Sequence, residues 1–428
     1  MGPRNDATAS NGGTPEDASY TPRIMPLVVQ KFGGTSLADA DRIRRVARRV
    51  VETHRDGNDV VVVVSAMGKS TDELVDLAHQ ISEHPHPREM DMLLTAGERI
   101  SMSLVAMAIE AHDVPAVSFT GSQAGILTTA EHGRAEIVDI RAFRVQESLD
   151  EGKVAIVAGF QGVSPDSKDV TTLGRGGSDA TAVALAASLG ADLCEIYTDV
   201  DGVFTADPRV VPSARKLDEV TFEEMLELAN SGAGVLMPRS VEFGIRYNIP
   251  IHVRSSFHDG EGTWVKEETM EEPIIRGIAH DDSGAKLTVH GVPDQPGIAA
   301  AVFESMAAAG VNVDMIVQNV SSRGVTDISF TVPATSAALA AEVAERVASE
   351  IGAIGVDVDT DISKITVVGA GMKSESGVAA TMFRILSDEG VNIEMISTST
   401  IRISCVVRGE DTQTAIEALH RGLIGEES

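Results

Sequence analysis

Aromatic residues and basic residues are scarce in this sequence, and each shortage excludes a class of protein. Phe, Trp and Tyr together make up 4% of the chain, which argues against stacking platforms for single-stranded nucleic acid. Lys and Arg number 35 against 64 Asp and Glu, so the formal net charge is −29. A surface this acidic repels nucleic acid and anionic membranes. We expect neither as a partner, and an anionic substrate must find a locally positive site.

Cysteines and long apolar runs are also few. Cys194 and Cys405 each lie in an apolar run and are expected to be buried thiols, which suits a reducing cytoplasm. No CxxC or HExxH motif is present, and no apolar run reaches the roughly 18 residues of a membrane span. Residues 1–24 are polar and rich in Gly and Pro. They are predicted to be a disordered tail, with the folded chain beginning near Met25.

A chain of 428 residues is expected to form several domains. Over residues 25–265, short apolar strands alternate with helical patterns, which predicts an α/β fold: a three-layer αβα sandwich with a mainly parallel sheet. The clearest strand is the β-branched run 60–64, typical of the interior of a parallel sheet. Residues 266–281 begin with a charged run that ends in proline, and they are predicted to be a linker.

The most informative stretch joins an apolar strand to an alanine-rich helix and reads Thr172-Leu173-Gly174-Arg175-Gly176-Gly177-Ser178-Asp179. Glycine lets backbone N–H groups approach an anion closely, and the following helix N-terminus adds aligned donors. Arg175 is able to grip a carboxylate or phosphate through two parallel hydrogen bonds. The loop therefore indicates an anion-binding seat. A plain glycine-rich turn is the alternative on this loop alone.

Three further strands end in polar turns. The first is followed by Lys31-Phe32-Gly33-Gly34-Thr35-Ser36, the second by residues 65–73, and the third by residues 198–209. Ligands of open α/β sheets bind at the carboxyl ends of strands, so these turns are expected to converge, the third around a nucleotide. Glu98 lies in an apolar helical run and needs a partner. A structural salt bridge with Arg99 or another arginine is the alternative to a ligand role.

An internal repeat follows residue 281. Residues 297–303 and 310–316 match residues 377–383 and 390–396 at a constant offset of 80 positions (377 − 297), and nine of the fourteen pairs are identical. Each copy has the ferredoxin-like βαββαβ pattern, which predicts two small domains, 282–361 and 362–428. A duplicated module after a catalytic domain suggests effector sensing. A purely structural dimerisation module is the alternative.

The sequence resembles the aspartate kinases of the amino-acid kinase superfamily. The resemblance rests on three motifs in order, around Lys31, Arg175 and Asp199, and on the repeat that follows them. The likeness is to short monofunctional enzymes of the actinobacterial type with tandem ACT domains, and it runs from Met25 to the C-terminus. It implies transfer of phosphate from ATP to the side-chain carboxylate of L-aspartate, giving 4-phospho-L-aspartate. That reaction is the first step of lysine, threonine and methionine biosynthesis.

The resemblance also implies partners. ATP would be the phosphate donor, and Mg²⁺ would be carried by the nucleotide. Lysine and/or threonine would act as effectors through the ACT domains. The enzyme would be cytoplasmic, and it would be a homodimer through its ACT domains or an α2β2 assembly. In the second case, a small subunit would start internally near Met270.

Site residues are implied by the matching motifs. Lys31 would stabilise the transferring phosphoryl group, Arg175 would grip a carboxylate of aspartate, Glu98 would bind the substrate ammonium or hold Arg175, and Asp179 would orient the cations. The expected aspartate-binding set is Lys69, Ser70, Thr71, Asp72, Glu73, Glu98, Arg175, Gly176, Gly177 and Ser178. The expected nucleotide-binding set is Lys31, Phe32, Gly33, Gly34, Ser65, Ser178, Thr198, Asp199, Phe204, Thr205, Ala206, Asp207, Pro208 and Arg209. The expected effector set is Asp294, Gly297, Ile298, Ala299, Asn312, Val313, Asp314, Gln318, Asn392, Ile393, Ser399 and Thr400.

One departure from the family pattern bears on activity. The family usually has Gly-Ala-Lys-Val-Leu where this chain has Gly232-Ala233-Gly234-Val235-Leu236, so a lysine expected to face the nucleotide phosphates is missing. Arg239 or Arg209 is a candidate to compensate. The sequence therefore leaves two alternatives open: a catalytically weak, amino-acid-sensing paralogue, and another acyl or carbamoyl kinase of the superfamily.

Overall fold

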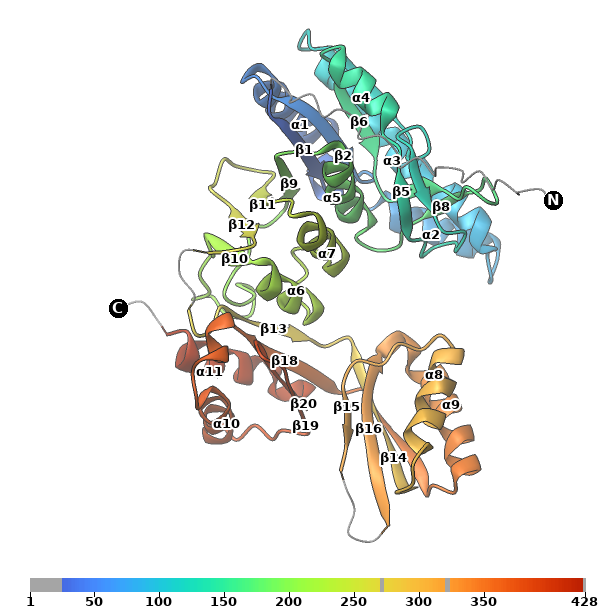
Figure 1. The fold of residues 1–428 in the computed structure, drawn as a ribbon, viewed down its shortest axis with the longest axis vertical. Coiled ribbons are helices and arrows are strands. Elements are labelled where there is room, and N and C mark those ends of the chain that lie inside the picture. The colour runs from blue at the N-terminus through green and yellow to red at the C-terminus, as the bar shows by residue number, and fades with distance from the viewer. Residues whose placement is uncertain (1–24, 270–272, 320–323, 426–428) are drawn as a thin grey trace, which may run out of the picture.

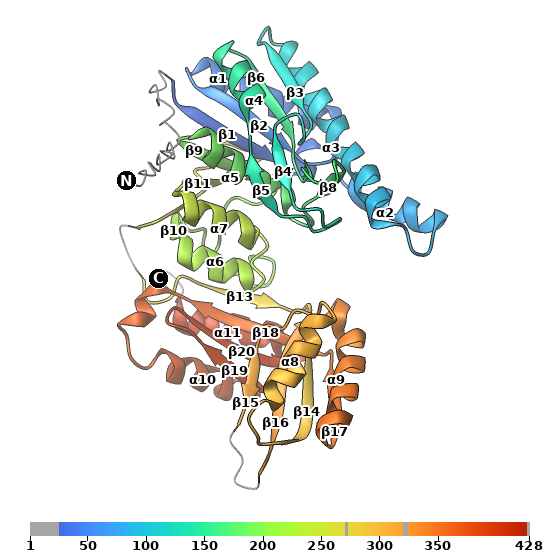
Figure 2. The same cartoon turned by 45° about the vertical axis from the view of Figure 1, so that its right-hand side comes forward.

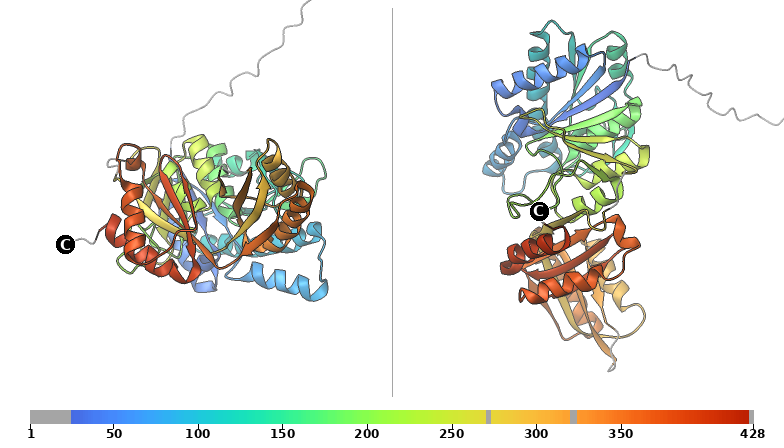
Figure 3. Two further views of the ribbon diagram at one scale, coloured as in Figure 1. Left: turned by 90° about the horizontal axis from the view of Figure 1, so that it is seen from below. Right: turned by 90° about the vertical axis from the view of Figure 1, so that its left-hand side faces the viewer.

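The computed structural model describes residues 25–269, 273–319 and 324–425. The predicted tail 1–24 and the proposed internal start at Met270 lie outside these residues. The chain forms an upper and a lower part, coloured from blue to red in chain order (Figure 1). We call them the catalytic part and the regulatory part, after the roles that the resemblance implies. The two parts keep this arrangement in the side view of Figure 3.

The catalytic part is built on an eight-stranded sheet. Its strands are parallel except for the β11–β12 pair. Their order is β10 (Glu219–Thr221), β12 (Thr263–Lys266), β11 (Ile251–Ser255), β9 (Leu193–Thr198), β1 (Leu27–Phe32), β2 (Asp59–Val64), β6 (Val154–Ala158) and β3 (Ala116–Phe119). The β-branched run predicted as an interior strand is β2, and it lies between β1 and β6.

Helices cover both faces of this sheet because alternate residues of its central strands face opposite ways. Val60, Val62 and Val64 pack in one core with α1 (Ala40–Arg55) and α3 (Pro87–Glu110). Val61 and Val63 pack in the other core, whose helices are α4 (Phe143–Asp150), α5 (Gly177–Leu189), α6 (Phe222–Asn230) and α7 (Pro238–Tyr247). The predicted αβα sandwich is confirmed, and Figure 2 shows α4 and α5 overlapping the strands of the sheet.

Helix α3 has the length and composition of a membrane span. Its Val105, Ala106 and Ile109 are buried in the core against α1 and the sheet, as in the core helix of a globular domain. The shorter α2 (Ser70–Ile81) contacts α3. Both cysteines are buried free thiols, as predicted.

A small second sheet, not expected from the sequence, lies beside the large one. Its strands are β5 (Ile137–Ile140), β4 (Ile126–Thr128), β7 (Gln161–Val163) and β8 (Val170–Thr172), in that order. These strands have three or four residues each, too short for a clear alternating pattern. The last of them, β8, leads directly into the glycine-rich loop, so this sheet fixes where that loop begins.

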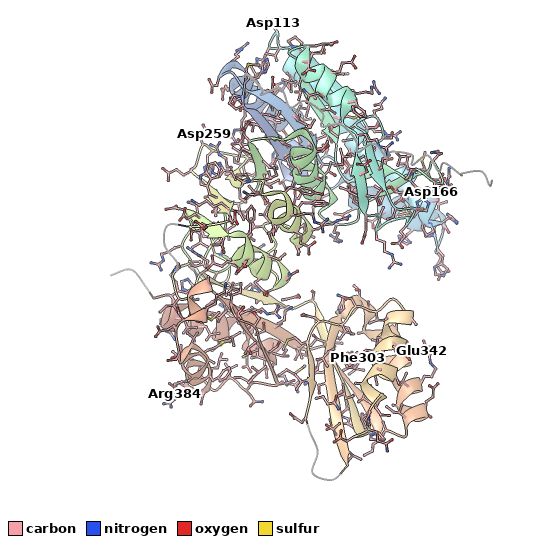
Figure 4. The ribbon with its side chains drawn as sticks, in the orientation of Figure 1. Asp113, Asp166, Asp259, Phe303, Glu342 and Arg384 are labelled. Atoms are coloured by element: carbon pink, nitrogen blue, oxygen red, sulfur yellow. The ribbon has the colours of Figure 1, made fainter. Side chains whose placement is uncertain are left out.

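The regulatory part contains the two predicted ferredoxin-like copies. The first consists of β14 (Gly284–Pro293), α8 (Ile298–Ala308), β15 (Ile316–Gln318), β16 (Val325–Pro333), α9 (Ala337–Ile351) and β17 (Gly355–Asp359). In its core, the ring of Phe303 in α8, which is labelled in Figure 4, meets the ring of Phe330 edge to face, with 5.5 Å between the ring centroids. The second consists of β18 (Ile362–Val368), α10 (Val378–Asp388), β19 (Met395–Thr398), β20 (Arg402–Arg408) and α11 (Thr412–Leu423).

The predicted linker 266–281 needs a correction, because it ends in a strand. Strand β13 (Gly277–Asp281) pairs antiparallel with β18 and completes the sheet β13-β18-β20-β19. It occupies the place that β17 holds beside β14 in the first copy. The first copy is therefore inserted within the second. A repeat search at one fixed offset could not reveal this, because the missing strand precedes both copies.

Candidate active site

The turns after β9, β1, β2 and β6 meet because these strands are neighbours in the sheet. The Gly33 N–H donates to the Tyr197 carbonyl at 3.3 Å, and the Gly68 N–H donates to the Gly34 carbonyl at 2.9 Å. A Cβ on Gly34 would lie 2.8 Å from the Gly68 carbonyl oxygen, so only glycine allows the turn after β1 to approach the turn after β2 this closely. The predicted convergence of the strand ends is confirmed.

Two residues of the predicted catalytic set form an ion pair. Lys31, near the end of β1, lies with its Nζ 2.5 Å from Oδ1 of Asp179, in the first turn of α5. The side chains are 11% and 10% exposed, so the pair is shielded but reachable. Ser178, also predicted, packs onto Gly159 after β6, where a Cβ would lie 2.7 Å from its Oγ. The glycine-rich loop is therefore held against the strand ends.

Two glycines of the loop have the left-handed conformation. Gly174 has φ 75° and Gly176 has φ 70°. At Gly176 a Cβ would also lie 1.9 Å from Cγ of Met237, so a side chain is excluded twice. Arg175 between them is exposed, and no hydrogen bond or ion pair involves it among the residues that the structure describes. Its guanidinium is free to meet an anion.

Glu98 is buried without a cation. Its side chain is 3% exposed; Oε1 accepts a hydrogen bond from the Ala66 N–H at 3.1 Å, and Oε2 has no partner within the described chain. Burial raises the pKa of Glu98 to about 7. The alternative of a salt bridge with Arg99 is wrong, because Arg99 is exposed and forms no ion pair with it. An unpaired buried carboxylate is costly, so Glu98 is poised for a cationic ligand.

The other predicted aspartate-binding residues lie where α2 begins. Lys69 is the N-cap residue, Ser70 donates to the Met67 carbonyl, and Asp72 and Glu73 stand exposed in the first turn. Their backbone continues from Ala66, whose N–H contacts Glu98. The structure thus brings the Lys69–Glu73 segment and Glu98 to adjoining turns.

Comparison with known proteins decides the family. The amino acid kinase family matches residues 26–255, and the ACT domain matches residues 287–347 and 365–423. The aspartokinase of Mycolicibacterium smegmatis is 59% identical over 94% of this chain and 98% of its own. The chain belongs to the aspartokinases. It is an ATP-dependent kinase of L-aspartate with ACT domains, as the motifs predicted.

Two further relatives agree with this assignment. The aspartokinase of Corynebacterium glutamicum is 56% identical over 92% of this chain and 96% of its own. The crystal structure of E. coli aspartokinase III in complex with aspartate and ADP (R-state) is 29% identical, covers 93% of this chain and 100% of its own, and has a TM-score of 0.80. A sensing paralogue or another acyl kinase is not favoured.

Within this aspartokinase, the predicted nucleotide-binding residues divide into two groups. Thr198 ends β9, and its Oγ1 donates to Oδ1 of the following Asp199 at 3.2 Å. Ser65 follows β2, and its N–H donates to the Phe32 carbonyl. The side chain of Phe32 is buried and stacks on Tyr197, with 4.7 Å between the ring centroids. Phe32 therefore offers only its backbone to a nucleotide. This first group, with Lys31, Gly33, Gly34 and Ser178, borders the strand ends.

The second group, residues 204–209, follows β9 at a greater distance along the chain. Asp207 forms a bidentate pair with the guanidinium of Arg209, which lowers the pKa of Asp207. Thr205 and Ala206 are buried, and Ala206 belongs to the core of the second ACT copy. Ala206 therefore contributes its side chain to the contact with the regulatory part, and the prediction that residues 204–209 surround a nucleotide stays a prediction.

The predicted effector residues lie at equivalent places in the two copies. Gly297, at φ 96°, precedes α8, and Ile298 and Ala299 form its first turn. Gln318 ends β15, while Asn392 and Ile393 precede β19, and Ser399 and Thr400 follow it. β15 and β19 contact each other. The segment 312–314 borders a cavity of about 360 Å³, together with Asn230, Lys364 and Arg402.

Sequence reasoning missed a buried network beside the site. Asp91 of α3, His132 and Thr172 are linked by hydrogen bonds, and no motif marks the first two. A signal was present in the spacing of Asp91, Thr95 and Glu98, which puts three polar residues on one face of an apolar helix. All three are buried.

Proposed function

We propose that Lys31, Asp179, Arg175 and Glu98 form the reaction centre for phosphorylation of L-aspartate. The observation that carries this proposal is the unpartnered Oε2 of buried Glu98, close in the fold to an ion pair that includes Lys31. Glu98 would accept the substrate ammonium and Arg175 a substrate carboxylate. Lys31 would approach the γ-phosphate, and Asp179 would hold the lysine in place.

The chemistry needs no strong general base. The attacking carboxylate of aspartate has an ordinary pKa of about 3.9 and is ionised at neutral pH. One of its oxygens forms a bond to the γ-phosphorus while the bond to the β–γ bridging oxygen breaks, and ADP leaves. The protein must hold two anions in line and neutralise the charge that spreads over the transferring group. Lys31 and the N-terminus of α5, with the Gly176 N–H, would supply that positive potential.

The nucleotide would lie over the ends of β1, β2 and β9, against Ser65, Ser178, Thr198 and Asp199. E. coli aspartokinase III has been solved with aspartate and ADP, which supports a shared site for both ligands. No group of three or more His, Cys, Asp or Glu suited to a metal occurs among the described residues. We therefore propose that Mg²⁺ arrives on the phosphates of ATP, where it would neutralise charge.

Regulation would come from lysine and/or threonine binding at the ACT copies. The same E. coli enzyme has been solved with lysine and aspartate in a T-state, with 29% identity and a TM-score of 0.71. The proposed ligand-reading residues are Asp294 and Asn312 in the first copy and Asn392 in the second. The enzyme would be a homodimer through its ACT domains, or an α2β2 assembly, and this pairing would complete the effector sites. It would act in the cytoplasm.

The test is an ATP- and aspartate-dependent hydroxamate assay on the pure full chain. Initial rates would be measured against aspartate, with and without lysine plus threonine. We expect turnover that needs both substrates and that falls when the two amino acids are added together. An absence of turnover at saturating substrates would refute the proposed centre, whereas turnover without any inhibition would refute only the effector assignment.

A further inference from the structure

A buried aspartate on α3 holds the strand that leads into the glycine-rich loop. Asp91 is completely buried. Its Oδ1 accepts a hydrogen bond from the Thr172 hydroxyl at 2.5 Å and from the Gly133 N–H at 3.1 Å, and its Oδ2 lies 2.6 Å from Nδ1 of His132. A buried charge requires such partners. Asp91 therefore joins three segments: the helix, the end of β8 and the turn before β5.

The two segments held by Asp91 enclose the base of the loop. Thr172 is the last residue of β8, and Arg175 follows three residues later. On the other side, Gly174 lies against the turn before β5, because a Cβ there would be 3.1 Å from the Gly133 carbonyl oxygen. The Ala135 N–H also donates to the Thr172 carbonyl at 2.9 Å. Asp91 thus fixes both the entry of the loop and the surface it rests on.

The same helix carries Glu98. Asp91, Thr95 and Glu98 follow at spacings of four and three residues, so they share one face of α3, and all are buried. Seven residues of α-helix span about 10 Å. A single rigid helix therefore sets the distance between the Glu98 carboxylate and the anchor of the Arg175 loop (Figure 1).

We infer that Asp91 is a positioning residue of the aspartate site, acting through Thr172 and Gly133 to hold Arg175 at a fixed distance from Glu98. The inference rests on the roles proposed for Arg175 and Glu98. It means that the hydroxyl of Thr172, which points away from the loop into α3, controls binding of the amino acid. Binding of the nucleotide depends on it less, because most of the proposed nucleotide contacts come from other strand ends.

The test compares two adjacent threonines of β8. Thr172→Val removes the hydroxyl that Asp91 accepts. Thr171→Val is the matched control, because the Thr171 hydroxyl is also buried and lies 2.6 Å from that of Thr128 but has no contact with Asp91. We expect Thr172→Val to raise the KM for aspartate about tenfold and to change the KM for ATP less than about twofold. Thr171→Val should leave both constants near wild type, and Thr172→Ser should restore the KM for aspartate.

Each outcome decides a separate point. An aspartate KM that rises no more in Thr172→Val than in Thr171→Val, or that rises together with the ATP KM, would overturn the inference. Arg175→Lys is measured in parallel: if it leaves the aspartate KM unchanged, the proposed role of Arg175 fails instead. If Thr172→Val does not fold, Thr172→Ala decides, because it removes the same hydroxyl that Asp91 accepts. An unchanged aspartate KM in that variant would also overturn the inference.

Discussion

Thr205 and His420 are hydrogen-bonded across the junction between the catalytic and regulatory parts, with Oγ1 and Nε2 2.8 Å apart. Thr205 belongs to the segment after β9, and His420 lies in α11 with no exposed surface. The Thr205 carbonyl also accepts the Ile278 N–H of β13 at 2.8 Å. The segment that continues from the end of β9 is therefore hydrogen-bonded to β13 and α11 of the second ACT copy. This contact offers a physical route from the proposed effector site to the proposed active site.

We expect His420→Leu to weaken this route while leaving the uninhibited rate within about twofold. Coupling energies between sites are typically about 1–3 kcal/mol, so the effector concentration for half inhibition should rise at least about fivefold. Arg421→Gln is the control, since Arg421 is the next residue, is 60% exposed and pairs only at the surface with Glu389. Equal inhibition curves for His420→Leu and wild type would show that the contact does not transmit the signal.

Glu98 gives the enzyme a pH dependence whose direction follows from its pKa of about 7. Below that pH the free enzyme holds Glu98 protonated, so kcat/KM for aspartate should fall as the pH drops from 8 to 6. Glu98→Gln should raise the KM for aspartate about tenfold or more and flatten the profile. Glu110→Gln, on the exposed end of the same helix, should change neither. A profile that keeps its shape in Glu98→Gln would contradict this role.

Glu98→Gln should weaken binding of aspartate but raise the free energy of unfolding at pH 8. Because folding raises the pKa of Glu98, the folded wild type binds a proton that the unfolded chain lacks between about pH 4.5 and 7, and its free energy of unfolding falls as the pH rises through that window. Glu98→Gln escapes this loss. It should therefore be more stable than wild type at pH 8, with a difference that shrinks toward pH 5 in thermal unfolding.

Lys31 and Asp179 were predicted to act together from two motifs far apart in the chain, and the fold unites them at 2.5 Å. Lys31→Met should lower kcat about 10²- to 10³-fold, the range for removal of one group that stabilises a transition state. The KM values should change much less. Lys153→Met is the control, since Lys153 pairs with Glu151 at the exposed surface. A loss confined to the KM for ATP would assign Lys31 to ground-state binding instead.

The parts of the fold that the sequence predicted are those with a strong local signal. The valine run of β2 and the glycine-rich loop between β8 and α5 have few alternatives, so their places could be read directly. Asp91 could not be found this way, because a buried carboxylate is recognised by its partners, and Thr172 and His132 come to it only through the tertiary fold. Strand β13 was missed for the same reason, since its pairing with β18 spans an entire inserted domain.

Thr205 and Ala206 show why a motif alone does not reveal what a side chain packs against. The motif that contains them does follow a strand whose end lies at the active site. Their burial, however, is decided by the second ACT copy, whose core includes Ala206 together with Ile365 and Leu419. Nothing in the local spacing of a polar loop distinguishes a side chain that faces a nucleotide from one that packs against another domain.

The first ACT copy offers a direct test of effector binding at Asp294. Its backbone N–H is bonded to the Gly324 carbonyl at 3.0 Å, and its side chain is exposed beside the start of α8. Asp294→Ala should relieve inhibition by lysine and threonine, raising the half-inhibitory concentration about tenfold or more, with no change in the uninhibited rate. Asp361→Ala, at the turn before β18, serves as the control. Unchanged inhibition in Asp294→Ala would remove this residue from the effector site.

Gly234, where the family has lysine, leaves room for the missing side chain. A Cβ there would meet only the Gly232 carbonyl oxygen, at 4.0 Å, and the backbone is not in the left-handed region. The two candidate compensating cations are already engaged, because Arg239 donates to the Ala135 carbonyl at 3.1 Å and Arg209 pairs with Asp207. A lysine at position 234 would therefore add a charge that the site lacks.

We expect Gly234→Lys to lower the KM for ATP about tenfold, as one charge-assisted contact of about 1.5 kcal/mol would do, with little change in the KM for aspartate. Gly355→Lys is the matched control, since Gly355 lies in β17 of the regulatory part with open space around it. If Gly234→Lys leaves the ATP KM and turnover unchanged, another cation already meets the phosphates. Arg239→Ala would then raise the ATP KM in wild type but less in Gly234→Lys, because the new lysine would substitute for the lost arginine.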